Sequence, residues 1–227
     1  DLPNKFQTPS LSHLFGTDWV GRDMLTRTIK GLSLSMKIGL LATLTSTIIA
    51  IILGIIGPTF GRRVDAVVTW FIDLVLSVPH TLVVILISIA MGGGLKGIVV
   101  GVAATHWTSL TRVIRAEVMQ IMESDYTKIS KNFGKSNWYI AKEHILPHVI
   151  PQIIVNAVLI FPHAILHEAS VTFLGFGLPP HEPAIGVILS ESMKYLTSGY
   201  WWLAFFPGLS LILVSMMVDK IGKNIEQ

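Results

Sequence analysis

Long stretches without Asp, Glu, Lys or Arg constrain this chain more than any other feature of its sequence. Five of them lie at 38–61, 74–95, 97–111, 144–167 and 195–218. A helix needs about 20 mostly apolar residues to cross a bilayer core about 30 Å thick. Because lipid offers no hydrogen-bond partner to an open sheet edge, such spans are helical. The pattern therefore predicts an all-α polytopic membrane protein, in agreement with a mean hydropathy of +0.63.

The expected spans lie near 38–60, 66–91, 97–118, 149–176 and 201–221. Residues 38–227 would then form one transmembrane domain, preceded by an extramembrane or amphipathic segment, 1–37. The sequence begins at Asp1 without a Met or a signal-like apolar stretch. We therefore expect a further N-terminal span to precede it in a longer protein.

Basic residues are distributed unequally between the two sides of the predicted bundle. The loops on one side hold only Lys96 and Lys194. The loops on the other side and the tail hold Arg62, Arg63, Arg112, Arg115, Lys128, Lys131, Lys135, Lys142, Lys220 and Lys223. The positive-inside rule places this second side on the cytoplasmic face of the cell (inner) membrane. The basic residues that precede the first span conflict with this orientation: Lys5, Arg22, Arg27, Lys30 and Lys37.

Two features are missing from the sequence, and their absence limits the kinds of site that it can form. The chain has no cysteine, which excludes disulfide frameworks and thiolate metal sites. It also lacks the Gly-x-x-x-x-Gly-Lys-Ser/Thr loop that cradles nucleotide phosphates. The sequence therefore has neither a thiolate site nor a nucleotide-binding loop of this kind.

The cytoplasmic loop at about 119–147 carries an amphipathic pattern. Tyr126, Ile129 and Phe133 recur at spacings of three and four, which places them on one face of a helix. Gly134 permits a turn after this helix, and Pro147 is typical of the first turn of the next one. A partner protein could bind the apolar face, and a connector that lies on the membrane surface is the alternative.

Three ionisable residues lie in the fourth predicted span: His163, His167 and Glu168. The two histidines are four residues apart, so on a helix they share a face and could bind one ion such as Ni, Co, Cu or Zn. Glu168 lies about 100° further round the helix, which favours a partner on a neighbouring face. His106 is a further candidate for the same translocation path, and His80 is a less favoured one. Hydrogen bonds to carbonyl groups of other helices are the alternative role, although ionisable residues within a membrane favour a pathway.

The cytoplasmic loop resembles that of ABC importer permeases, whose pattern reads Glu-Ala-Ala, three residues, Gly, nine residues, Ile-x-Leu-Pro. The matching positions are Gly134, Leu146 and Pro147, and the departures are Lys128, Ile129, Ser130 and His144. Three other stretches resemble the C-type permeases of the peptide and nickel ABC importers: "LFGTDWVGRDMLTRTIKGLSLSMKIGL" (14–40), "VTFLGFGLPPHEPAIGVILSE" (171–191) and "WWLAFFPGLSLILVSMMVDKIGKNI" (201–225). This resemblance covers nearly the whole chain in order and implies a type I ABC importer permease fold.

Within that family, "THWTSLTRVIRAEV" (105–118) and "FPHAILHEASVTFLGFG" (161–177) look most like the nickel-permease branch. The resemblance implies a permease that pairs with a second permease, two ATPase subunits and an extracytoplasmic substrate-binding protein, within membrane lipid and without nucleic acid. It also implies a transport subunit rather than an enzyme, with no cofactor bound by this chain and with ATP used by the ATPase subunits, one of which would bind the apolar face of the cytoplasmic loop. Its cargo would be nickel or a related transition metal, carried as a chelate. The first alternative keeps the fold and imports di- or oligopeptides.

Two alternatives belong to other classes of protein. The spacing of His163 and His167 is that of zinc ligands, which admits an intramembrane metalloenzyme. Such enzymes carry a glutamate between the two histidines as the base, whereas Glu168 follows the second one. A purely structural scaffold is the other alternative, and the intramembrane histidines argue against it.

Overall fold

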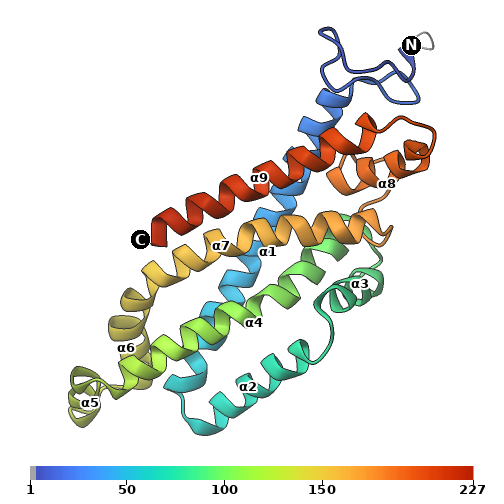
Figure 1. Cartoon of the computed structure of the whole chain (residues 1–227). Helices are drawn as coiled ribbons and strands as arrows, with labels where there is room; N and C mark the ends of the chain where they lie inside the picture. The colour runs from blue at the N-terminus through green and yellow to red at the C-terminus, as the bar shows by residue number, and fades with distance from the viewer. Residues whose placement is uncertain (1–3, 227) are drawn as a thin grey trace.

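The computed structural model describes residues 4–226, and helices dominate this part of the chain. Four long helices form its frame: α1 (Met24–Thr59), α4 (Gly94–Glu123), α7 (Leu146–Phe173) and α9 (Trp202–Glu226). Shorter helices connect or cover them: α2 (Arg62–Leu76), α3 (His80–Ala90), α5 (Asp125–Asn132), α6 (Asn137–Ile140) and α8 (Ile185–Leu196). A π-helical turn, η2 (Ala141–Ile145), joins α6 to α7. The predicted all-α fold is confirmed (Figure 1).

Helix α1 packs against both α4 and α7 (Figure 1). Small residues permit this close approach. A Cβ atom on Gly54 would lie 2.8 Å from Ile114 of α4, and one on Gly39 would lie 2.7 Å from Ile165 of α7. Helices in lipid associate through such close packing, because the lipid tails are as apolar as the side chains. The long helix α1 therefore fixes the positions of α4 and α7, which carry the residues of interest.

The membrane-spanning helices differ from the predicted set. Among the described residues, three helices are long and apolar enough to cross a membrane: Met24–Thr59, Asn137–Phe173 and Trp202–Ile225. A fourth span exists if α2 and α3, which form a bent pair, are counted as one. The predicted number of five spans is therefore not confirmed.

The span expected at 66–91 is broken into two helices. Helices α2 and α3 meet at an angle of 94°. The break contains Pro79, which lacks a backbone N–H and so does not continue a helix from the preceding residues. Pro79 instead precedes the first turn of α3 and places His80 at its first position.

Helix α1 is longer than the first expected span, 38–60, and takes in part of the segment expected at 1–37. Helix α1 begins at Met24, directly after Asp23. The Asp23 carboxylate caps the helix by accepting a hydrogen bond of 2.8 Å from the backbone N–H of Thr26. A side-chain cap of this kind satisfies an N–H that has no partner within the helix. The segment before the helix therefore ends at residue 23.

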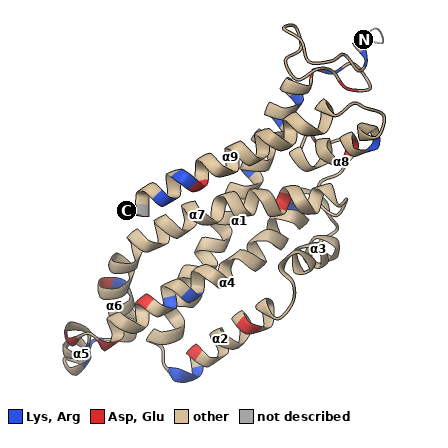
Figure 2. Cartoon of the chain, in the orientation of Figure 1, with Lys and Arg blue, Asp and Glu red and all other residues tan. Residues whose placement is uncertain are grey.

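Residues 4–23 fold against α8 and the start of α9, at the end of the bundle away from α5 and α6 (Figure 1). Asp18 is fully buried and accepts hydrogen bonds from Arg22 at 2.7 Å and from Arg27 at 2.9 Å. Arg27 also donates to Glu191 of α8 at 2.8 Å. Figure 2 shows that most charged residues lie toward the two ends of the bundle. Arg22 and Arg27 are paired with carboxylates, which balance their positive charges. These two arginines can therefore lie on the side of the membrane opposite the cytoplasmic loop.

Candidate functional site

Helix α5 presents an exposed apolar surface made of Tyr126, Ile129 and Phe133, which we call the α5 surface. The exposed fractions of these residues are 46%, 53% and 80%. The helix ends at Asn132, and Gly134 makes the turn with a φ of +74°. The predicted amphipathic helix and the turn after it are confirmed.

The chain returns toward the membrane at Leu146 and Pro147, as predicted. Helix α7 begins at Leu146, and Pro147 lies in its first turn. The preceding helical turns, α6 and η2, run into α7 without a break, so that one helix extends from Asn137 to Phe173. Helix α5 is therefore separated from this long helix by only the turn at residues 133–136.

A hydrogen bond between Ser130 and His144 ties α5 to η2. The distance from the Ser130 hydroxyl oxygen to His144 Nε2 is 2.8 Å. The His144 ring also lies 5.5 Å from the ring of Tyr126 and 5.7 Å from that of Tyr139. Both bonded residues are departures from the family pattern in this loop. Sequence reasoning did not pair them, although the two departures together were the available signal.

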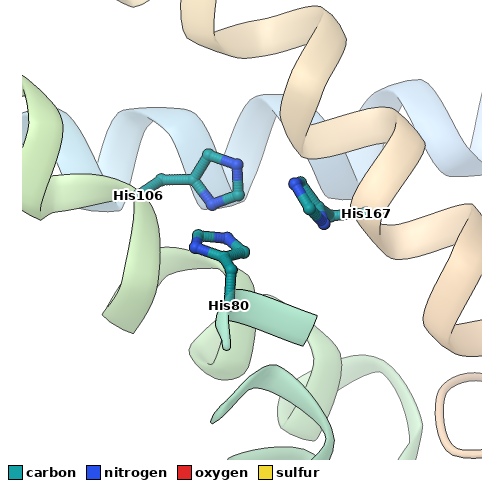
Figure 3. Close-up of side chains that lie close together, drawn as sticks. All are labelled: His80, His106 and His167. Carbon is teal, nitrogen blue, oxygen red and sulfur yellow. The ribbon is translucent and has the colours of Figure 1, made fainter. Parts of the chain in front are cut away.

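Three histidines from separate parts of the chain form a second candidate site, which we call the histidine cluster. They are His80 at the start of α3, His106 on α4 and His167 on α7 (Figure 3). Their ring centroids are 4.6 Å apart for His80 and His106, 4.5 Å for His80 and His167, and 5.2 Å for His106 and His167. His106 is buried, and the other two are half-buried. The cluster therefore reaches the surface of the chain.

Two hydrogen bonds orient rings of the histidine cluster. His106 Nδ1 lies 2.9 Å from the carbonyl oxygen of Val102. His80 Nε2 lies 3.0 Å from the hydroxyl oxygen of Thr105, which is itself 3.0 Å from the same Val102 carbonyl. Both contacts engage one nitrogen of the ring and leave the other one available.

The predicted metal-site residues separate into two groups. His106 and His167 are brought together, and the pairing of His163 with His167 at one ion stays a prediction. His163 is exposed, one turn earlier on α7, and is not part of the histidine cluster. His80 replaces it. Sequence reasoning gave His80 little weight, and the available signal was Pro79, which redirects the chain just before it.

Glu168 lies outside the histidine cluster, and its role on the translocation path stays a prediction. Its side chain is fully buried. One carboxyl oxygen accepts a hydrogen bond of 2.9 Å from the hydroxyl of Thr172, and the other has no hydrogen-bond partner among the described residues. The physical reason is the angle of about 100° between consecutive helical residues, which turns Glu168 away from the face of His167.

The chain is similar in sequence to transport proteins. Residues 46–227 match a family described as the binding-protein-dependent transport system inner membrane component. The dipeptide transport system permease protein DppC of Bacillus subtilis (strain 168) is 34% identical over 218 residues, which are 96% of this chain and 68% of the relative. The oligopeptide transport system permease protein OppC of the same strain is 31% identical over 225 residues, which are 99% of this chain and 73% of the relative.

The fold is similar to chains in solved transporter structures. A chain of the MetNI methionine ABC transporter in an inward-facing conformation matches with a TM-score of 0.72 and 14% identity, covering 89% of this chain and 95% of that one. A chain from the crystal structure of an amino acid ABC transporter with histidines matches with a TM-score of 0.67 and 16% identity, covering 89% and 94%. At these identities the likeness concerns the fold alone.

Proposed function

The chain belongs to the family of binding-protein-dependent transport system inner membrane components, and from this premise we propose that it is the permease through which an ATP-driven importer carries dipeptides or oligopeptides. Membership makes it a multi-pass protein of the inner membrane and a permease of an ABC importer. It is a transport component, and the ATPase is a separate subunit. The expected type I ABC importer permease fold is confirmed.

One observation carries the choice of peptide cargo. Relatives that are 31% to 34% identical over almost the whole chain are named as dipeptide or oligopeptide permeases. The prediction of the nickel branch depended on three histidines. The similarity to the peptide permeases extends over alignments of more than two hundred residues. The peptide alternative is therefore better supported than the nickel prediction.

In the proposed complex, this chain pairs with a second permease, two ATPase subunits and an extracytoplasmic substrate-binding protein. The exposed α5 surface supports an ATPase contact, because soluble proteins bury such apolar side chains against a partner. The hydrogen bond between Ser130 and His144 would pass a movement of α5 to η2 and then to α7. Closure of the ATPase subunits would thus move the helix that carries His163 and His167 as a rigid body.

The test is transport by the reconstituted complex. We would place the two permeases and two ATPases in liposomes, add the binding protein, and measure uptake of a labelled dipeptide, a labelled oligopeptide and chelated Ni²⁺. We expect peptide uptake, together with ATP hydrolysis that rises when the binding protein carries peptide. Stimulation by the Ni²⁺ chelate but by neither peptide would contradict the peptide proposal.

Import of a transition metal as a chelate is the second candidate function, and the histidine cluster is the observation that favours it. Imidazole nitrogens suit Ni, Co, Cu and Zn. A transport site must also release what it binds, and the half-buried positions of His80 and His167 meet that need. The same uptake experiment decides between the two cargoes.

A further inference from the structure

We propose that His80, His106 and His167 together bind one transition-metal ion of the Ni, Co, Cu or Zn class. Each histidine offers one ring nitrogen, and these three atoms all lie within 4.8 Å of one another. The rings come from α3, α4 and α7 and converge on a common space (Figure 3). The proposal concerns a site in the permease itself and does not depend on which cargo the importer carries.

The distances are close to those of a bound ion. Metal–nitrogen bonds of about 2.0–2.1 Å place the nitrogens of a tetrahedral site about 3.3 Å apart. Because no two of the three nitrogens are more than 4.8 Å apart, each separation has to shorten by at most about 1.5 Å. Rotation of the half-buried side chains of His80 and His167 about their own bonds can provide this change without a movement of the helices.

The hydrogen bonds of the cluster prepare two of the ligands. A carbonyl oxygen can only accept, so His106 Nδ1 must donate to Val102, and His106 Nε2 keeps a free lone pair. When the Thr105 hydroxyl donates to the Val102 carbonyl, its oxygen accepts from His80 Nε2 and leaves His80 Nδ1 free. Histidine ligands in metal sites almost always donate their other N–H to a carbonyl or a similar acceptor.

The chemistry of the three ligands selects the class of metal. Neutral imidazole nitrogens suit the later transition metals, whereas Ca²⁺ and Mg²⁺ require oxygen ligands. The neighbouring carboxylate, Glu168, is buried and accepts from Thr172, so it supplies no oxygen to the cluster. Three protein ligands leave one position of a tetrahedral ion open to water or to another small ligand.

The test measures Co²⁺ binding to the assembled, detergent-solubilised transporter without a polyhistidine tag, in the absence of ATP and binding protein. We expect one Co²⁺ per permease chain, with the visible absorption of a tetrahedral site. Each of His80→Ala, His106→Ala and His167→Ala should weaken binding at least ~10-fold. His163→Ala is the matched control, because His163 lies one turn away on α7 and is exposed; it should bind as the wild type does.

Thr105 provides a finer test as a positioning residue. Thr105→Val removes the hydroxyl that holds His80 and should weaken Co²⁺ binding about 10-fold, whereas Thr105→Ser should restore it. X-ray absorption of the Co²⁺-loaded wild type needs no variant and should show three imidazole nitrogens at about 2.0–2.1 Å. The proposal is overturned if X-ray absorption shows fewer than three imidazole ligands, or if His163→Ala weakens binding as much as His167→Ala does.

Discussion

At the end of the bundle where residues 4–23 lie, aromatic and charged side chains are paired within the chain, whereas at the opposite end α5 and α6 leave theirs exposed. Trp19 stacks on Tyr195 at 4.9 Å, and Phe15 stacks on Phe206 at 4.6 Å. Every residue from 131 to 139 is exposed. The first end packs these aromatic side chains within the chain, whereas the second has the properties of a surface that a partner covers.

The same kind of residue therefore has different consequences at the two ends. An aromatic side chain that packs within the chain contributes to its folding, whereas an exposed one contributes mainly when a partner covers it. Substitutions at the N-terminal segment should lower stability, and substitutions on the α5 surface should lower transport. The predictions below test this contrast.

The largest expected effect is at Asp18. Asp18→Ala leaves the Arg27 guanidinium, which is largely buried, without one of its two carboxylate partners. Loss of one partner from a buried ion pair costs about 3–5 kcal/mol, measured as the free energy of unfolding in detergent. Glu123→Ala breaks an exposed pair with Lys128 at the other end and should cost less than about 1 kcal/mol. Equal losses of unfolding free energy in the two variants would contradict the proposed difference between the two ends of the bundle.

Phe133→Asp should act on transport and not on folding. Phe133 is 80% exposed, so the free energy of unfolding should change by less than about 0.5 kcal/mol. A charge in an apolar contact with the ATPase should reduce peptide uptake by about 10- to 100-fold, which corresponds to about 1.4–2.7 kcal/mol. The measurement is uptake together with co-purification of the ATPase. Normal uptake by a normally assembled complex would show that the α5 surface is not the ATPase contact.

A tryptophan at each end gives a matched pair. Trp19 is half-buried, and Arg22 and Arg27 lie over its ring at 5.5 Å and 5.2 Å. Trp19→Ala should therefore lower the free energy of unfolding by about 1–2 kcal/mol. Trp138 is 69% exposed, so Trp138→Ala should change it by less than about 0.5 kcal/mol. The measurement is thermal unfolding of the two variants. A larger loss of stability in Trp138→Ala than in Trp19→Ala would contradict the proposed difference between the two ends.

The smallest expected effect concerns acid and Asp23, which lies just before α1. Partial burial alone raises the pKa of Asp23, but hydrogen bonds from His13 and from the N–H and hydroxyl of Thr26 outweigh it and hold the pKa below its ordinary value. A lowered pKa adds stability above the unfolded-state pKa of about 4, and this is lost as the pH falls through the folded-state pKa.

The measurement for Asp23 compares the wild type with Asp23→Asn, which keeps a capping oxygen without the charge. The wild type should be more stable by less than about 1 kcal/mol at about pH 6, and the difference should shrink as the pH falls below the unfolded-state pKa of about 4. A difference that grows as the pH falls would mean that the sign of the pKa shift is wrong.

Several features could be predicted from local patterns in the sequence. The spacing of Tyr126, Ile129 and Phe133 predicted the helix in the cytoplasmic loop, because the geometry of a single helix determines which of its residues share a face. The resemblance of ordered stretches predicted the ABC importer permease, and the family match confirms it.

Other features depend on contacts between distant residues. No local pattern shows that His80, His106 and His167 meet, because the packing of α3, α4 and α7 brings them together. The rule that placed basic residues in the cytoplasm counts charges without their partners, and therefore missed that Arg27 pairs with Asp18 and Glu191.

The break between α2 and α3 also has a consequence for biogenesis. The two helices have 15 and 11 residues, and at 1.5 Å per residue they measure about 22 Å and about 17 Å, so neither crosses a core of about 30 Å. Helix α3 packs with α4 through Val84, Ile98 and Val102, and the two are consecutive in the chain. During synthesis we expect α3 and α4 to enter the membrane together as a hairpin, which assembles His80 with His106 before α7 has been translated. His167 would then complete the cluster only when the later part of the chain folds against this hairpin.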